Sequence, residues 1–508
     1  MTLLKPLLRR GSGRPDFMIP VLLILIPLLT GLIAFFIKNE KLVRSWTLVS
    51  SLLTLVISIL GLTLLKEEKY LQHQSEWMPA LGSSFSVKLD GLGQLLCLLN
   101  AVTYPIVFIA TWKTPYKKSN NFFALMLLAQ AGLMGVFLAM DALVFYFFWE
   151  LAIIPMYFLC SQWGGEKRIQ VTFKFFIYTF IGSLLMLIGI LYIYAHTENH
   201  SFDIAVFYKV VLSSKQQNLV FWLMFVAFAI KMPIFPLHTW QPDTYEQAPT
   251  ATTMVLSGVM VKMGVFGMIR WLFPVVTGAS FMWGDFITPL AIIGMIYASL
   301  IALRQDDLKR LVAYSSIAHI GLLCAGMFTQ NTYGVQGVMI QMFSHGINII
   351  GLWIVVEWIE RNTGTRKISE LGGLAQTAPV LTFFLVIIAL ANIALPLTNA
   401  FVGEFLIFNG ILTSFTKYYV WFTVMAGICI ILGAVYILNM IRKVAYGNVN
   451  EVTSVVADIK FNEKLALGII VVLILWVGIY PQPMLNLTSD LTNSLVNKFE
   501  VLRHAVPK

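Results

Sequence analysis

The sequence predicts an all-α polytopic membrane protein, and two observations lead to that fold class. Hydrophobic residues make up 58% of the 508 positions, whereas charged residues make up only 12%. The hydrophobic residues also form apolar runs that recur from end to end, each of about the 20 residues that an α-helix needs to cross a bilayer. This pattern excludes a soluble enzyme.

Charge, proline and glycine punctuate these runs and divide them into about 14 transmembrane helices. The spans are expected near 17–37, 45–65, 90–112, 121–140, 142–161, 171–195, 219–240, 250–273, 286–304, 311–329, 332–359, 377–415, 418–441 and 464–482. No A-x-A cleavage site follows the first run, so we interpret it as a span and not as a signal peptide. We expect a tight turn at Asp141 between helices 4 and 5.

Two spans, helix 7 and helix 12, contain proline breaks next to polar residues. The sequences are KMPIFPLH at 231–238 and ALPLTNAFVGE at 394–404. Proline frees backbone carbonyls that lipid cannot satisfy, so we expect both helices to be discontinuous and to line a protein or water-filled interior. The breaks lie five helices apart, which predicts two inverted five-helix repeats with functional sites at the broken helices. The alternative is coincidence, because prolines are common in membrane helices.

The repeats suggest a division of the chain into four parts. These are helices 1–3 (1–120), the first repeat of helices 4–8 (121–275), the second repeat of helices 9–13 (276–445), and a loop with helix 14 (446–508). Basic residues gather in the loops after odd-numbered helices, so the positive-inside rule places these loops in the cytoplasm and both termini outside. The basic N-terminal residues Lys5, Arg9, Arg10 and Arg14 argue against this orientation. The net charge of +10 mostly reflects the loops, and we expect no nucleic-acid partner.

The four cysteines, Cys97, Cys160, Cys324 and Cys429, are scattered singly along apolar segments. This spacing offers neither a disulfide framework nor an iron–sulfur ligand set. The chain also lacks H-E-x-x-H spacing, a phosphate loop and a dinucleotide fingerprint. We therefore expect no redox centre, cofactor or metal in this chain.

Ionisable residues inside the spans are the strongest functional signal. A charge at bilayer depth costs roughly 2.5 to 3.5 kcal/mol, so Lys231 and Lys262 must face a protein interior or water. We expect Glu150 in helix 5 to be the counter-ion of Lys231, so that the protonation of the lysine depends on the carboxylate. The alternatives are a protonated Glu150 packed against backbone, and a Lys262 that extends to the membrane surface.

Four further groups extend this set. His238 follows Lys231 by seven residues, which is roughly 10 Å along a helix and too far for one hydrogen bond. His319, His345 and Glu404 lie in helices 10, 11 and 12. Each histidine could instead be a structural core residue, and Glu404 could cap the second half of helix 12. In chain order Glu150, Lys231, Lys262, His319, His345 and Glu404 form a possible horizontal row within the membrane, which favours protons or small cations as cargo.

The runs KMPIFPLHTWQPDTYEQAPT, RQDDLKRLVAYSSIAHIG and FFWELAIIPMYFL strongly resemble the antiporter-like subunits of respiratory complex I, NADH-quinone oxidoreductase. The resemblance covers nearly the whole chain. At the helix 12 position the L-type and N-type subunits carry lysine. The glutamate of FVGEFLIF resembles the M-type subunits, which are equivalent to mitochondrial subunit 4.

The resemblance implies a proton pump in which Glu150 modulates Lys231, Lys262 is the central relay, His319 and His345 bridge, and Glu404 exchanges protons with the outside. It also implies that NADH, FMN, iron–sulfur clusters and quinone bind to partner subunits and that L-type and N-type subunits are neighbours. The low cysteine count and the bacterial-like length favour a bacterial cytoplasmic membrane, and the alternative is a plastid relative that acts with ferredoxin. The alternatives are a subunit of a multisubunit cation/proton antiporter, a subunit of a proton-pumping hydrogenase or formate-linked complex, and a passive structural subunit.

Overall fold

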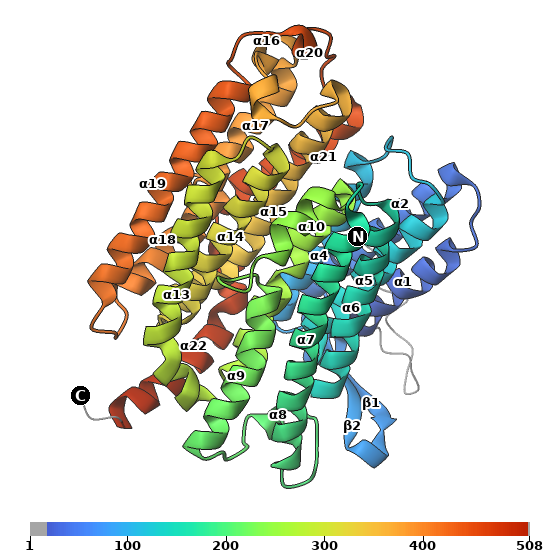
Figure 1. Cartoon of the computed structure of the whole chain (residues 1–508). Helices are drawn as coiled ribbons and strands as arrows, with labels where there is room; N and C mark the ends of the chain where they lie inside the picture. The colour runs from blue at the N-terminus through green and yellow to red at the C-terminus, as the bar shows by residue number, and fades with distance from the viewer. Residues whose placement is uncertain (1–17, 506–508) are drawn as a thin grey trace.

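The computed structural model describes residues 18–505 and is almost entirely helical (Figure 1). The basic N-terminal residues lie outside the described residues. Among the described residues, eleven helices are long and apolar enough to cross a membrane. They are α2 (Glu40–Thr63), α4 (Gly91–Ala110), α5 (Ser119–Leu138), α6 (Ala142–Trp163), α7 (Arg168–Ala195), the composite Thr250–Leu272, α13 (Thr277–Arg304), α14 (Leu308–Met327), α15 (Thr332–Thr363), α19 (Tyr419–Val444) and α21 (Phe461–Ile479).

Three shorter apolar helices, α1 (Ile19–Ala34), α17 (Pro379–Asn392) and α18 (Asn399–Leu412), fall within expected spans 1 and 12. Helix α9 (Ser214–Lys231) overlaps expected span 7 but begins before it and ends earlier. The composite span 8 is made of α11 (Thr250–Val255), η3 (Leu256–Met260), α12 (Lys262–Gly267) and η4 (Met268–Leu272), of which η3 and η4 are π-helical. The polytopic helical fold is confirmed, whereas the count of fourteen spans stays a prediction.

Both expected breaks occur. Helix α9 ends at Lys231, and the chain resumes helical structure only at α10 (Trp240–Gln247). In span 12, residues 393–398 separate α17 from α18. The prolines explain both interruptions, because each removes an amide donor from the helical ladder.

The two repeats use equivalent packing. Helix α5 packs along α6, as α13 packs along α14 five spans later. Helix α7 packs along α9, as α15 packs along α17 and α18. Because five spans separate each equivalent pair, the corresponding helices cross the molecule in opposite directions, as inverted repeats require.

The tight turn expected at Asp141 is present, since α5 ends at Leu138 and α6 begins at Ala142. The Asp141 side chain accepts hydrogen bonds from the amides of Leu143 and Val144, which caps the N-terminus of α6. It also accepts one from the Ser83 hydroxyl at 2.9 Å. One buried carboxylate therefore fixes both the turn and the neighbouring loop.

Several elements were not expected from the sequence. Strands β1 (Gln72–Met78) and β2 (Ser83–Lys88) form an antiparallel hairpin between α2 and α4. Helix α22 (Gln482–Ala505) was not expected either, and it packs against α4, α13 and α15. The remaining short elements are α3 (Glu68–Leu71), η2 (Pro79–Leu81), α8 (Ile204–Phe207), η5 (Ile368–Glu370), α16 (Leu374–Thr377) and α20 (Glu451–Ser454).

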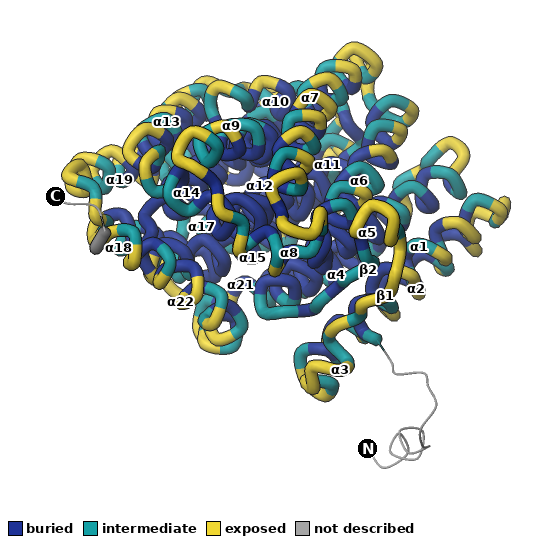
Figure 2. Tube along the Cα trace, turned by 90° about the horizontal axis from the view of Figure 1, so that it is seen from below, coloured by how far each residue is buried: buried dark blue, intermediate teal, exposed yellow. Residues whose placement is uncertain are grey.

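The bundle has two recognisable ends. In Figure 1, α16 and α20 lie at the top, and the hairpin, α8 and α22 lie at the bottom. Figure 2 shows buried residues along the middle of the molecule and exposed ones on its periphery. The most apolar stretches of α15 and of Thr250–Leu272 are entirely buried, whereas those of α2 and α19 are only 33% buried. The interior spans are thus those that carry Lys262 and His345.

Candidate functional site

Lys262 lies at the centre of the candidate site and is fully buried. It begins α12 directly after the π-helical segment η3, whose wider turns change the pattern of backbone hydrogen bonds. The Lys262 Nζ atom donates to the Ser257 carbonyl at 2.7 Å and lies 2.9 Å from His345 Nδ1. The lysine therefore does not extend to the membrane surface.

Close backbone packing brings the Lys262–His345 contact about. A Cβ atom on Gly346 would lie 2.8 Å from the Gly258 carbonyl oxygen, closer than real Cβ atoms approach. Only glycine at position 346 lets α15 approach η3 this closely. The residue next to His345 in sequence thus sets its distance from Lys262.

A second contact lies further along the predicted row. His319 Nδ1 in α14 lies 3.1 Å from Glu404 Oε1 in α18, and Gln341 Nε2 in α15 donates to the same oxygen at 3.2 Å. The imidazole rings of His319 and His345 have their centroids 5.5 Å apart. Glu404 is the sixth residue of α18, so it does not cap that helix.

Lys262, His345, His319 and Glu404 therefore form one continuous set, which we call the relay row. Sequence reasoning found all four members but missed Gln341. That residue precedes His345 by four positions and so shares its helix face, a signal that could have identified it.

Side chains of α15 stabilise the break in span 12. The Ser344 hydroxyl donates to the Asn399 carbonyl at 3.1 Å, and the Asn399 amide group donates to the Ser344 carbonyl at 3.4 Å. Asn348 donates to the Ala391 carbonyl at 3.3 Å. These bonds satisfy polar groups at the break that lipid could not. They also fix the start of α18 and hence the position of Glu404.

The expected direct pair between Glu150 and Lys231 is not formed. No ion pair within 4.0 Å joins them in the described structure, and Glu150 Oε1 and Lys231 Nζ are both buried without a hydrogen-bond partner. The Lys231 ammonium instead lies 5.9 Å from the ring centroids of Trp149 and Phe175. Opposite charges in a low-dielectric interior attract each other even without direct contact, so Glu150 and Lys231 can still act on one another. The aromatic rings occupy the surroundings in which we expected the carboxylate.

His238 also differs from expectation. The estimate of two helical turns from Lys231 is wrong, because residues 232–239 are not helical. His238 is buried within the break, where its ring contacts the rings of Phe235 and Tyr297. Its Nδ1 atom has no hydrogen-bond partner among the described residues. His238 therefore makes no contact with the relay row.

The break in span 7 is anchored by side chains of its surroundings. Trp240 Nε1 donates to the Ile230 carbonyl at 3.0 Å. Lys174 Nζ in α7 donates to the Thr239 carbonyl and contacts Asp243, each at 2.8 Å. The start of α10 is thus held against α7 by a charged side chain. No sequence pattern indicated that Lys174 pairs with this segment.

Charged residues join the two repeats at the end of the bundle that carries α16 and α20. Arg310 of α14 contacts Glu246 of α10 at 2.8 Å. Arg366 contacts the same glutamate at 2.8 Å and also Asp307 and Glu360. A cavity of about 730 Å³ beside them is lined by Glu246, Glu360 and the start of α11. This end offers protonatable groups next to the spans that lead to Lys262.

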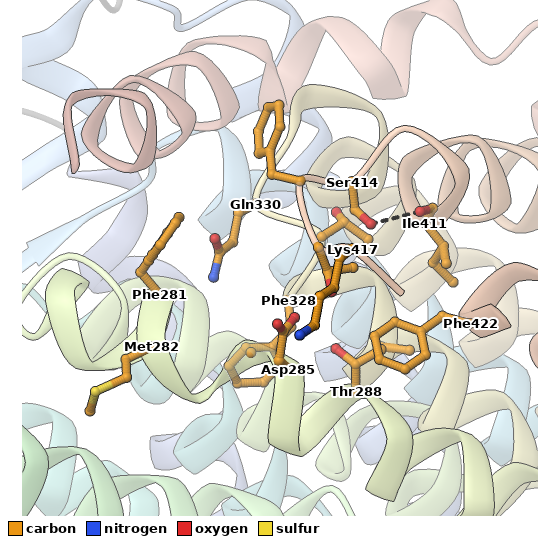
Figure 3. A pocket seen from close by; sticks show the side chains of 15 residues that line it. Phe281, Met282, Asp285, Thr288, Phe328, Gln330, Ile411, Ser414, Lys417 and Phe422 are labelled. Atoms are coloured by element: carbon orange, nitrogen blue, oxygen red, sulfur yellow. Dashed lines mark hydrogen bonds between the residues drawn. The ribbon is translucent and has the colours of Figure 1, made fainter. Parts of the chain in front are cut away.

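A second cavity, of about 330 Å³, lies at the opposite end of the second repeat (Figure 3). Asp285 and Thr288 of α13, Gln330 before α15, and Ser414 and Lys417 after α18 line it. Ser414 donates to the Ile411 carbonyl at 2.7 Å, which shapes the end of α18. Glu404 lies two helical turns before Ile411 on α18. Sequence reasoning missed this cavity, because polar residues near helix ends are common.

The fold and the relay row define a polytopic helical membrane protein whose ionisable groups follow one another from span 8 to span 12. Residues 139–433 match the family model described as NADH:quinone oxidoreductase/Mrp antiporter, TM. The chain belongs to this family.

Individual relatives agree with that assignment. The chain is 35% identical to F(420)H(2) dehydrogenase subunit M of Methanosarcina mazei, over 94% of this chain and 99% of the relative. It is 34% identical to NADH-quinone oxidoreductase subunit M of Rickettsia typhi, over 94% of this chain and 98% of the relative. A chain of respiratory complex I from Thermus thermophilus has the same fold, with a TM-score of 0.86 and 27% identity over 94% of this chain and 99% of that one. The resemblance inferred from the motifs is confirmed.

Proposed function

We propose that the chain is a proton-translocating, M-type membrane subunit of a respiratory complex I-type oxidoreductase and carries no redox centre itself. The relay row is the observation that supports this most. Lys262 and His345 are in hydrogen-bond contact, the two histidine rings are neighbours, and His319 contacts Glu404. A surplus of buried protonatable groups in contact is what stepwise proton transfer needs.

The chemistry of each contact allows a proton to pass. A charged Lys262 donates to His345 Nδ1, and transfer leaves a neutral amine and an imidazolium. His345 Nε2 has no hydrogen-bond partner among the described residues, so it is free to pass its proton toward His319 through a small movement or a water. His319 then protonates the Glu404 carboxylate. Every step exchanges a proton between groups that can each exist in both states.

The first repeat supplies the control. Glu150 and Lys231 lie apart. A change in the distance between them therefore changes the electrostatic potential that α9 produces at Lys262. Moving a proton against about 150 mV costs roughly 3.5 kcal/mol, by scaling from about 2.3 kcal/mol per 100 mV. Changing the distance between two buried charges changes their interaction energy by an amount of that order.

The proposal extends to the surroundings of the chain. NADH, flavin, iron–sulfur clusters and quinone would bind to partner subunits, and L-type and N-type subunits would be the neighbours. The basic loops favour the α16 and α20 end as the cytoplasmic side of a bacterial membrane. Protons would then enter at the charged cavity beside Glu246.

Replacing Lys262 by Met tests this proposal, because the side chain keeps its length and loses its charge. In membrane vesicles that contain the assembled complex, we expect proton uptake driven by electron transfer to quinone to fall at least about tenfold, as for loss of a proton-transfer group. NADH, reduced F420 and reduced ferredoxin should each be tried as donor. Lys464→Met, at an exposed position of α21, is the matched control. Normal pumping by Lys262→Met would contradict the proposal.

A second candidate is a subunit of a multisubunit cation/proton antiporter, which the description of the matching family also covers. Sodium-dependent proton exchange in vesicles without any electron donor would favour it. Proton uptake that requires both a donor and a quinone would favour the oxidoreductase.

A further inference from the structure

A small cavity lies beside the end of the relay row, on the side that faces α19. It has a volume of about 30 Å³, and its lining brings together residues of α13, α14, α17, α18, α19 and the break in span 12. His319, Asn392, Glu404 and Tyr436 supply its polar groups, and Gly433 lies in the same wall. A volume of this size suffices for one water molecule.

The polar groups around this cavity have unused hydrogen-bonding capacity. Both contacts to Glu404 end on Oε1, and no described residue donates to Oε2. Glu404 is only 4% exposed, so little of its surface reaches the surroundings of the bundle. A carboxylate oxygen with no protein donor and little access to solvent is costly, and it points to a partner in the cavity.

Hydrogen bonds to Ser315 orient two of these groups, the Tyr436 hydroxyl and the Asn392 amide group. Tyr436 donates its hydroxyl hydrogen to Ser315 Oγ at 2.9 Å, which leaves the lone pairs of the Tyr436 oxygen free to accept. Asn392 Nδ2 donates one hydrogen to the same Ser315 oxygen at 3.2 Å and keeps a second hydrogen. Ser315 thus fixes both side chains, one as an acceptor and one as a donor toward the cavity.

We propose that this cavity binds an ordered water that joins Glu404 to Tyr436 and Asn392. The water donates to Glu404 Oε2 and to the Tyr436 oxygen and accepts from Asn392 Nδ2, so it makes the three hydrogen bonds typical of a buried water. Tyr436, Ser315 and Asn392 are positioning residues, because they act on Glu404 through the water. The functional part of this inference rests on the proposed function, in which Glu404 ends the relay row.

A substitution at Gly433 can displace the water without removing any hydrogen bond between protein groups. A Cβ atom at this position would meet only the Tyr436 hydroxyl, at the ordinary contact distance of 3.8 Å. Gly433→Ala therefore adds a methyl group to the cavity wall without a clash. Gly427→Ala is the matched control, since it lies on the same helix and its Cβ would meet nothing within 4 Å.

The direct test is a structure of the intact membrane complex at a resolution that shows ordered waters. We expect a density peak about 2.6 to 3.2 Å from Glu404 Oε2 and from the Tyr436 oxygen in the wild type, and no such peak in Gly433→Ala. A wild-type cavity without that peak, or one filled by a lipid chain, would overturn the proposal. This result does not depend on whether the complex pumps protons.

The functional test measures protons pumped per electron transferred. We expect Gly433→Ala and Tyr436→Phe to lower this ratio by on the order of 2- to 10-fold, the effect of losing one hydrogen bond, and to move the pH optimum of pumping upward. Gly427→Ala and Tyr104→Phe, a buried tyrosine whose hydroxyl has no partner in the described structure, should leave both unchanged. If the wild type pumps and both cavity variants match it, the role of the water is refuted. A wild type that does not pump refutes the proposed function instead.

Discussion

At the scale of single residues, the relay row shows how ionisable groups persist inside a membrane protein. Lys262, His345, His319 and Glu404 lie in the interior, and each has a polar partner within 3.1 Å. An isolated charge there would be neutralised or excluded, because burial strongly disfavours an unpaired charge. The contacts lower the free-energy cost of ionising each group. Under the proposed function, they also make the groups act as a unit.

Lys262 and His345 should therefore behave as one functional pair. We expect Lys262→Met and His345→Ala each to remove most proton pumping, and the double variant to be no worse than the more severe single one. Residues that act as a unit are strongly non-additive, and a double-mutant cycle on pumping rates measures this. Effects that simply multiply would show that the two residues act independently.

The residues of the site were predictable from sequence to an uneven degree. Lysine, histidine and glutamate inside apolar runs are conspicuous, so all four members of the relay row were found. Their contacts were harder to predict, because the sequence does not show which of these side chains lie next to each other. Glu150 and Lys231 were expected to touch but lie apart, and Tyr436 was not recognised because a tyrosine in a membrane helix is unremarkable.

At the scale of elements, the contact between η3 and α15 controls the geometry of the site. Gly346→Ala would place a Cβ atom 2.8 Å from the Gly258 carbonyl oxygen. This oxygen belongs to the backbone, so it cannot move aside as a flexible side chain could. The helices must then separate, which lengthens the Lys262–His345 contact. We expect at least a severalfold loss of pumping with assembly retained, measured on vesicles and on native gels.

Gly468→Ala is the matched control for this variant. Gly468 lies in α21, and a Cβ atom there would meet nothing within 4 Å. Both substitutions raise helix propensity equally. If the two variants pump equally well, close packing at Gly346 does not set the geometry of the relay row.

Among the elements, those governed by long apolar runs or by proline were predicted correctly. The breaks in spans 7 and 12 followed from proline, which has the same effect wherever it occurs. The hairpin and α22 were missed for a physical reason. The hairpin strands are mostly polar and partly exposed, and α22 is amphipathic, so neither resembles a span. Their positions depend on packing against α1, α4 and α15, which sequence patterns do not reveal.

At the scale of the whole molecule, a bidentate ion pair ties span 3 to span 8. Arg270 contacts Asp90 at 2.6 and 2.7 Å, and the arginine is almost fully buried. Burial alone would raise the pKa of Asp90, but the Arg270 guanidinium and the Gly93 amide hold it below its usual value. The carboxylate that precedes α4 therefore stays ionised throughout the physiological range.

Asp90→Asn should destabilise the protein, because it leaves Arg270 buried without a counter-ion. The expected loss is on the order of 3 kcal/mol. Since the folded pKa of Asp90 is lowered, the stabilisation is complete above the unfolded pKa of about 4 and is lost only as the pH falls below it. The difference in thermal inactivation temperature between the wild-type and variant complexes should thus stay constant from about pH 5 to 8. A difference that varies across this range would contradict the assignment.

The division of the molecule into four parts stays a prediction, as does its orientation in the membrane. The charged cavity beside Glu246 and the cavity at Asp285 lie at opposite ends of the bundle. Under the proposed function, they would serve as the entrance and the exit of a proton path whose middle is buried. The central claim is that Glu404 gains and loses a proton during that passage.

Infrared difference spectroscopy of the purified complex during turnover tests this claim most directly. We predict that the carbonyl-stretch band of a protonated carboxylic acid appears or disappears when electron transfer begins, shifts in Glu404→Asp and is absent in Glu404→Gln, while Glu500→Gln in the exposed part of α22 leaves it unchanged. A carboxylic acid band that persists unaltered in Glu404→Gln would contradict the account.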